Sequence, residues 1–529
     1  MYRSFITADG AGKFEIKMML DKSFERQRGE FMKKQLSDYE GKTLTNNIDD
    51  NLEFFHALLK KDAVLRTREL KLRPKNLRAA LLYMDSMVDT AVLNESVIRP
   101  MLLCENEELP NDALEILQNE VLFACELETA DDIGTMLKAV LYGDTLLLID
   151  GEKTAVVVGT KGWRTRGVSE PGDERVLQGP REGFDEALML NAGMLRRKLP
   201  TPDLCMESMS IGRKTDTKIF ICYLESLVEP KTLKELKRRL QAIDIDGILD
   251  SNYINELIKP HRLSLFKTIG STERPDIVAA RLLEGRIAVM VDGTPVVLTL
   301  PYLFCENFQS DDDYYLNFYV AGIGRILRYL SFFLSVLVPA FYLALTTYHP
   351  ELLPTSFMIT ISAARGGIPF PSFLECILLI MVFEVLKETG IRMQQSVGHA
   401  LSIVGGLVVG QAAVEAKIVS APMLIIVALG GICGLVVPRL KGVCFFWRLI
   451  LVLCATLLGL YGVFAGTVLF MVSVFSLESF GVDYTSTAAR FSAQSMKDTL
   501  IRAPWWCMIT RPFSLTKDKI RQRVRGKNR

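Results

Sequence analysis

The spacing of apolar residues divides the chain into two halves. Up to about residue 320, short apolar runs alternate with polar stretches at strand and helix periods. Beyond that point, long apolar runs occupy about 326–347, 372–388, 397–414, 421–437 and 445–477. A helix needs about 20 such residues to cross a bilayer. The pattern predicts an α/β front half followed by a multi-pass bundle of about 4–6 transmembrane helices.

The front half contains an internal repeat. A buried strand pattern runs into an acidic turn and then a helix, first from residue 79 and again from residue 219. Tyr83 aligns with Tyr223 and Ser86 with Ser226. Each copy closes with a β-hairpin pattern in which Asp-Gly forms the turn, at residues 150–151 and 292–293. Matching order and spacing favour duplication over the strand-turn-helix pattern that any two α/β units share.

These patterns predict five regions. The order is a polar N-terminal extension, two cytosolic α/β subdomains, a transmembrane helical domain and a basic cytosolic C-terminal tail. Their bounds are 1–49, 50–175, 176–310, 320–480 and 481–529.

The last apolar run is too long for one straight crossing. Residues 445–477 contain Gly459, Gly462 and Gly466, so the run is either one long tilted helix or a tight hairpin. The basic loop at about 438–448 and the basic tail both favour the cytoplasmic side. Four crossings before that loop and a hairpin after it satisfy these charges. The alternative makes 372–388 interfacial or re-entrant and leaves four crossings in total, but it places the basic loop outside.

Charge and cysteine usage refine this picture. The net charge is only +1, but acidic residues exceed basic ones up to residue 320 and basic residues dominate afterwards. A charged N-terminus without a signal-peptide pattern places the front half in the cytosol. The ten cysteines form no CxxC pair, which argues against a disulfide framework or a zinc site.

The run at 372–388 carries charged residues, which are costly inside lipid. On a helix, Glu384 can pair with Lys387 and Glu388 with Arg392, which lowers that cost. Glu375 lies near the other end of the helix, where its side chain could snorkel to an interface. Glu384 lies deepest in the apolar run, so it is the first candidate for a polar pore residue.

A second polar pair falls in the following run. Gln411 and Glu415 share one helix face. With Glu384, Lys387 and Glu388 they suggest a polar seam inside the bundle, read either as a water-lined cation path or as salt bridges at helix ends.

Small and rigid residues mark structural positions in the membrane half. Pro369 and Pro371 set where the helix at 372–388 begins. Gly406 and Gly410 lie one helical turn apart, which lets helices approach closely in lipid. In the front half, Arg274 and Asp276 are interpreted as a structural ion pair at a subdomain junction.

The sequence carries no catalytic signature. It has no P-loop, GxSxG, HExxH or complete GxGxxG motif, and its four histidines lie far apart. We therefore expect no enzyme activity, no cofactor, no metal site and no nucleic-acid partner.

Several long motifs resemble the A subunit of GerA-type spore germinant receptors. The segments are TERPD from residue 272, LLEGRIAVMVDGTPVVLTLP from 282, DDDYY from 311, PFPSFLECILLIMVFEVLKETGIR from 369 and SIVGGLVVGQAAVEAKIVS from 402. The resemblance covers roughly residues 50–515.

The resemblance implies a multi-pass protein of the inner spore membrane with its N-terminal region facing the spore core. It implies a transporter-like B subunit and a lipoprotein C subunit as partners. It also implies a homo-oligomer, a pentamer, that forms a nutrient-gated channel for monovalent cations. Alternatives are a stage V AF-like accessory channel that amplifies germination and a non-conducting scaffold. A secondary transporter fits less well, because the repeat lies only in the front half.

Overall fold

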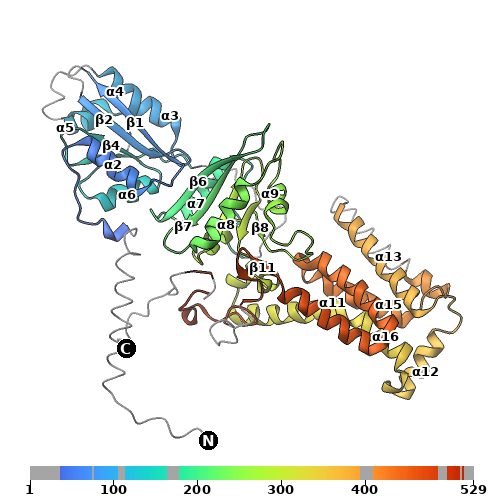
Figure 1. Ribbon diagram of the computed structural model, residues 1–529. Helices are drawn as coiled ribbons and strands as arrows, with labels where there is room; N and C mark the ends of the chain where they lie inside the picture. Colours follow the sequence, from blue (N-terminus) through green and yellow to red (C-terminus); the bar gives the residue numbers. More distant parts are fainter. Residues whose placement is uncertain are drawn as a thin grey trace, which may run out of the picture.

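The computed structural model describes residues 36–73, 77–104, 113–124, 126–163, 178–392, 408, 410–486, 497–512 and 515–516. Gly406, most of the apolar run at 397–414, most of the N-terminal extension and the end of the basic tail lie outside these ranges. The first subdomain lies at one end of an elongated molecule, the second in the middle and the apolar helices at the other end (Figure 1).

The first subdomain, called copy 1 below, is a five-stranded antiparallel sheet with helices on both faces. Its strands lie in the order β1-β2-β4-β5-β3. The strands are β1 Leu65–Leu72, β2 Leu77–Met84, β3 Leu127–Ala130, β4 Thr145–Ile149 and β5 Ala155–Val158. The α-helices are α2 Ile48–Leu58, α3 Thr90–Val92, α4 Arg99–Leu103, α5 Ala113–Ile116 and α6 Ile133–Leu141.

The second subdomain, copy 2, has the equivalent strand order, β6-β7-β9-β10-β8, and is also antiparallel. Its strands are β6 Leu204–Ile211, β7 Thr217–Leu224, β8 Gly270–Thr272, β9 Ile287–Val291 and β10 Val297–Leu300. Its helices are α7 Leu188–Lys198, α8 Pro230–Gln241, α9 Ser251–Ile258 and α10 Pro275–Leu282. A shared strand order is what the internal repeat predicts.

A buried cap at the first helix repeats in both copies. In copy 1, Asn51 bonds the backbone of Thr45 through both ends of its amide, and Asp150 accepts from the first amide of α2. In copy 2, Asn191 makes the same two bonds to the backbone of Asp185. The hairpin aspartate of copy 2 likewise accepts from the first amide of α7. Free amides at the start of a helix need such acceptors, and both copies supply them with an aspartate from the same β-hairpin position.

One hydrophobic core joins the two copies. Alternate residues of β4 face opposite sides: Leu146 and Leu148 point into the shared core, while Leu147 and Ile149 point to the outer helices of copy 1. The shared core also takes residues from α2, α6, α7 and α10. Because both faces of this strand are covered, all five residues of β4 are buried.

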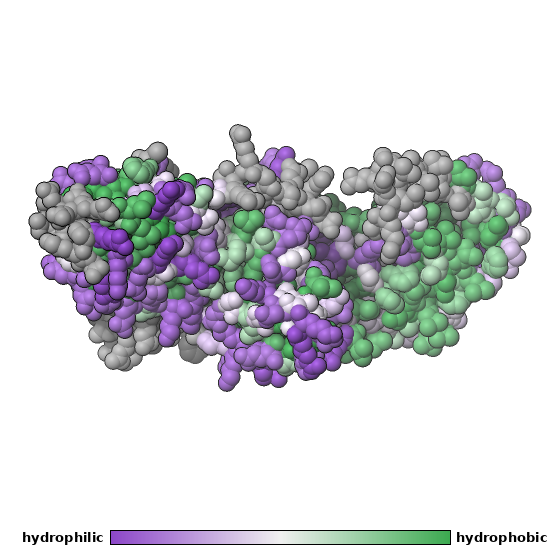
Figure 2. Space-filling model, turned by 90° about the horizontal axis from the view of Figure 1, so that it is seen from above, coloured by the Kyte–Doolittle hydropathy of each residue, from purple (hydrophilic) through white to green (hydrophobic). Residues whose placement is uncertain are grey.

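The second half of the chain is a helical bundle with an apolar surface (Figure 2). Within the described ranges, two helices, Phe318–Tyr348 and Pro438–Phe475, are long and apolar enough to cross a membrane by length and composition. The α-helices of this half with defined bounds are α11 Phe318–Tyr348, α12 Thr355–Ala364, α13 Ser372–Arg392, α15 Ala421–Leu435 and α16 Lys441–Phe475, and residues 410–415 are also helical. Helix α13 begins directly after Pro371, as its two prolines predict.

Helix α16 is a hairpin rather than a straight rod. Gly459 has φ 61°, outside the helical region, and a Cβ on Gly462 would lie 1.9 Å from the Cys454 carbonyl oxygen. The rings of Trp447 and Phe470 pack with centroids 5.0 Å apart. In a straight helix these residues would lie about 35 Å apart. Of the two interpretations of this run, the structure therefore has the hairpin. Glycine is needed at Gly459 for the positive φ of the turn and at Gly462 for the close contact.

Candidate functional site: the junction of the two halves

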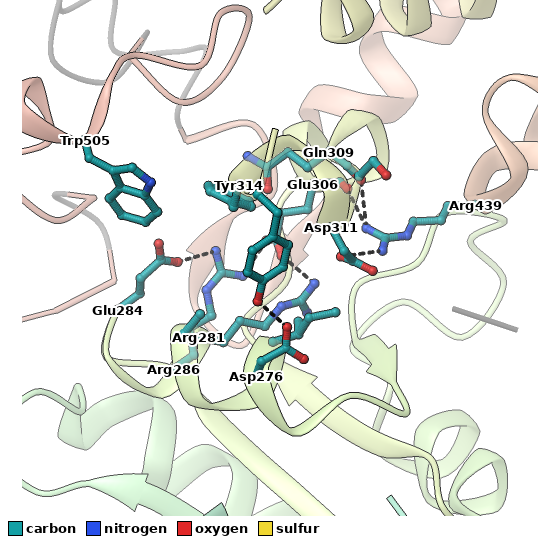
Figure 3. Close-up of a pocket in the computed structure, with 14 residues that line it drawn as sticks. Asp276, Arg281, Glu284, Arg286, Glu306, Gln309, Asp311, Tyr314, Arg439 and Trp505 are labelled. Atoms are coloured by element: carbon teal, nitrogen blue, oxygen red, sulfur yellow. Dashed lines mark hydrogen bonds and ion pairs between the residues drawn. The ribbon is translucent and has the colours of Figure 1, made fainter. Parts of the chain in front are cut away.

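A connector, defined as residues 301–317, links copy 2 to α11 and contains the short helices η4 (Phe304–Phe308) and η5 (Asp311–Tyr314). Beside it lies a cavity of about 180 Å³ lined by α10 of copy 2, the connector, Arg439 and Trp505 (Figure 3). Four stretches of the chain that are distant in sequence therefore meet at one place.

Glu306 is the acidic centre of one side of this junction. Its carboxylate accepts from Arg286 of copy 2 and from the Leu303 amide, and lies 3.4 Å from Arg281 Nη2. Arg439, which precedes α16, donates to the carbonyls of Glu306 (3.0 Å) and Gln309 (3.1 Å). Glu306 and Arg286 are both buried, so removing either one would leave the charge of the other uncompensated.

Asp313 is the centre of the other side. Arg325 of α11 donates to it across 3.2 Å, and Arg328 forms a second ion pair with it. Arg325 also reaches Asp498 at 2.9 Å, so the first turns of α11 are tied to the C-terminal segment. The side chain of Arg325 is fully buried. Such a network stabilises one arrangement only when every member stays paired.

The two tyrosines of the connector extend these ties. Tyr314 donates its hydroxyl to Asp498 across 2.9 Å. Tyr315 donates to Asp276 at the start of α10, and Asp276 also pairs with Arg274 across 2.7 Å. The predicted Arg274–Asp276 pair is therefore present. Burial first, and the carboxylate of Asp498, raise the pKa of Tyr314 well above its usual value, so its hydroxyl remains a donor at neutral pH.

The polar residues of α13 pair near its C-terminal end. Lys387 Nζ lies 3.0 Å from Glu384, as predicted from their spacing. Glu388 lies 3.3 Å from Lys441 at the start of α16. The side chain of Arg392, its predicted partner, is outside the described part of the chain. Glu384 and Lys387 are partly buried, so this end of α13 carries a charged pair against the bundle.

Glu375 corrects the snorkelling prediction. Its side chain is 0% exposed, and one carboxylate oxygen accepts from the Ser420 amide and hydroxyl, both at 2.6 Å. Ser420 is the N-cap of α15, so the carboxylate sits at the positive end of that helix. The positive end of a helix favours a buried anion, so one carboxylate oxygen finds its partners inside the bundle rather than in water.

Gln411 and Glu415 form a pair of their own, with Gln411 Nε2 donating across 2.9 Å. Both are exposed on the single chain. The nearby Lys417 lies beside Gly367, which precedes α13, whereas Glu388 lies at the other end of α13. Lys417 and Glu388 therefore mark opposite ends of α13. Gly410 faces Leu424 of α15, consistent with close helix packing.

Sequence reasoning missed Arg448. It was assigned to the basic loop at 438–448, but α16 begins at Lys441 and places Arg448 two turns inside the bundle. There it donates to the Ser335 carbonyl (2.8 Å) and the Gly430 carbonyl (3.0 Å). Its signal was a lone arginine between two apolar runs, CFFW and LILVL, because a charge in such a position needs buried partners.

The chain is similar in sequence to known spore germination proteins. A family model described as Bacillus/Clostridium GerA spore germination protein matches residues 53–514. Spore germination protein KA of Bacillus subtilis (strain 168) is 41% identical over 460 residues, which cover 86% of this chain and 84% of that protein. Spore germination protein GerLA of Bacillus cereus is 34% identical, with 86% of this chain and 93% of that protein covered.

An uncharacterized membrane protein, YfkQ of Bacillus subtilis (strain 168), is 36% identical over 92% of this chain and 94% of its own length. A crystal structure of the N-terminal domain of the A subunit of the Bacillus megaterium spore germinant receptor GerK3 is 33% identical. It covers 50% of this chain and 98% of that chain, with a TM-score of 0.40.

Proposed function

Because the chain belongs to the Bacillus/Clostridium GerA spore germination protein family, we propose that it is the A subunit of a germinant receptor in the inner spore membrane. In this proposal it assembles with a transporter-like B subunit, a lipoprotein C subunit and further copies of itself, as a pentamer. The assembly is a channel that opens on a nutrient signal and releases monovalent cations.

The proposed topology has six crossings, with copy 1, copy 2 and the C-terminal tail on the cytosolic side. Two contacts support it. Arg439, between α15 and α16, binds the connector beside copy 2, whereas Tyr348 at the end of α11 reaches the Thr456 carbonyl near the α16 turn. The start of α16 therefore lies at the end of the bundle near copy 2, and the end of α11 lies with the α16 turn at the other end. Each arm of α16 has a length of roughly 24–27 Å, close to the hydrocarbon thickness of about 30 Å.

The contacts of the connector are the main support for a receptor role. Within five residues, Asp311 lies 3.5 Å from Arg439, Asp313 binds α11, and Tyr315 binds α10 of copy 2. A displacement of copy 2 therefore pulls on the first helix of the bundle and on the segment before its last hairpin. Coupling between two sites needs a contiguous element of this kind that both sites can bias.

The proposed cation path uses the polar residues of the bundle. Glu384 and Lys387 at one end of α13, and Gln411 and Glu415 near the other, supply ligands and charge at two depths. Gln411 and Glu415 are exposed on one chain, and lipid is a poor solvent for them. Packing of several copies around a water-filled axis would hydrate them.

Potassium release from spores lacking this chain tests the proposal, with several nutrients supplied separately. We expect release to fail for one nutrient class and to stay normal for the others. Slower release for every nutrient would instead identify an amplifying accessory channel. In spores carrying Glu384→Gln, a channel role predicts slower release at normal protein level, with Glu351→Gln, an exposed residue outside the helices of the path, as the control. Unchanged release with Glu384→Gln would favour a scaffold.

A further inference from the structure

A loop of copy 2 presents an unusual exposed side chain. Residues 259–266 form the first part of the connection between α9 and the strand β8, and Leu263 at the tip is 99% exposed. The tip is held by Lys259, whose ammonium donates to the Ser264 carbonyl, and by the Ser264 amide, which donates to the His261 carbonyl (3.1 Å). A single exposed leucine is ordinary on a protein surface, so its meaning depends on what lies around it.

The loop lies against the membrane half. Phe266 is buried and packs against Phe470 in the second arm of α16, with ring centroids 6.0 Å apart. Between the loop and the ends of the hairpin is an open groove of about 820 Å³. Its lining includes Leu265, Trp447 and Leu477. The groove therefore combines an apolar wall from copy 2 with the end of a proposed transmembrane hairpin.

The charge of the groove selects its occupant. His261 and Arg262 line it, and it has no acidic lining residue in the described part of the chain. Arg262 takes part in none of the ion pairs found among the described residues. On the arm that contributes to the groove, Val472 and Phe475 are exposed apolar side chains next to Ser473 and Ser476 of its lining. Basic side chains beside an apolar surface match the headgroup region of a bilayer.

We propose that this groove binds an anionic phospholipid of the cytosolic leaflet, with Leu263 and Leu265 among the acyl chains and Arg262 on the headgroup. The inference rests on the membrane placement of α16 proposed above. It gives copy 2 a second anchor, independent of the connector, that fixes its distance from the membrane. An anionic lipid surface attracts each nearby basic residue by about 1 kcal/mol. One arginine therefore contributes about a fivefold preference for anionic over neutral lipid.

Photocrosslinking of the full chain in vesicles tests this site. Leu263→benzoylphenylalanine is placed in vesicles of phosphatidylglycerol mixed with phosphatidylcholine, or of phosphatidylcholine alone, and adducts are read by intact mass. We expect a lipid adduct, about fivefold more abundant with phosphatidylglycerol. Adding Arg262→Glu should remove that preference. The soluble control, Phe123→benzoylphenylalanine, is 74% exposed in copy 1 and should capture no lipid.

A further control separates the failure of this site from the failure of the membrane placement. Phe464 of α16 is 71% exposed on the bundle, so Phe464→benzoylphenylalanine should capture lipid whenever α16 lies in the bilayer. Lipid at Phe464 but none at Leu263 would overturn the groove proposal alone. A crosslink from Leu263 to a second copy, or equal yields in both vesicle types, would also overturn it. No lipid at either position would contradict the membrane placement itself.

Discussion

Copy 1 and copy 2 have the same frame and different surfaces. Their strand orders match, and the same asparagine-and-aspartate cap begins both. They differ at α6 and α10 and the strand that follows each, where copy 2 meets the membrane half. The aligned pairs there are Asp132 and Arg274, Ala139 and Arg281, and Asp144 and Arg286.

These differences lie where copy 2 is attached to the rest of the chain. In copy 1, Asp144 pairs locally with Lys161 across 3.2 Å. In copy 2 the aligned position is Arg286, which pairs with Glu306 of the connector. The hairpin after α16 also docks on copy 2, since Thr232 donates to the Phe480 carbonyl. In the described part of the chain, the ties to the membrane half come from copy 2, which leaves copy 1 as the distal member. A few charged positions on a duplicated frame suffice for this change of role.

Removing Arg286 should produce the largest effect. Arg286→Ala leaves Glu306 buried without its main partner, which costs about 3–5 kcal/mol. Asp144→Ala, the matched change in copy 1, leaves a partly exposed lysine and should cost about 1 kcal/mol or less. Thermal unfolding of the purified chain measures both. Equal losses would show that the two copies do not differ at this position.

Removing the repeated cap should affect both copies alike. Asn51→Ala and Asn191→Ala each leave buried backbone groups of the first helix segment unpaired, at a cost of about 1–3 kcal/mol. Hydrogen exchange measured by mass spectrometry should lose protection around residues 45–58 in the first variant and 185–198 in the second. Loss of protection in only one of the two would mean that the caps are not equivalent.

A smaller difference between the copies should depend on pH. Burial favours a higher pKa for Glu207 of copy 2, but hydrogen bonds from Lys237 and Tyr223 outweigh it and hold the pKa below its usual value. Its stabilisation is therefore complete above the unfolded pKa of about 4.3 and is lost as the pH falls through the folded pKa. The aligned residue in copy 1 is Thr67, which has no such titration.

We expect Glu207→Gln to lower the stability of copy 2 by up to about 1 kcal/mol at pH 7, because the pair is partly exposed. At pH 3 the difference should shrink. Hydrogen exchange of β6 and β7 at the two pH values reports it, with β1 and β2 as the internal reference. A difference that grows on acidification would contradict the assignment.

Sequence alone predicted the repeat because its signals are local. Strand periodicity and Asp-Gly turns need no knowledge of distant partners. The hairpin in α16 stayed open between two readings, since Gly459 is compatible with either until its φ is known. Glu375 and Arg448 were misplaced for another reason. Their partners, Ser420 and Ser335, lie far away in the chain, and no spacing rule connects them.

Copy 2 is proposed to act on the apolar helices through the connector. Arg439→Gln tests it most directly, because Arg439 joins the segment before α16 to the connector carbonyls. The measurement is nutrient-triggered potassium release from spores with normal levels of the variant. Arg213→Gln, at an exposed ion pair of copy 2 away from the connector, is the control. The account predicts slow or absent release with Arg439→Gln and normal release with Arg213→Gln. Normal release in both would contradict it.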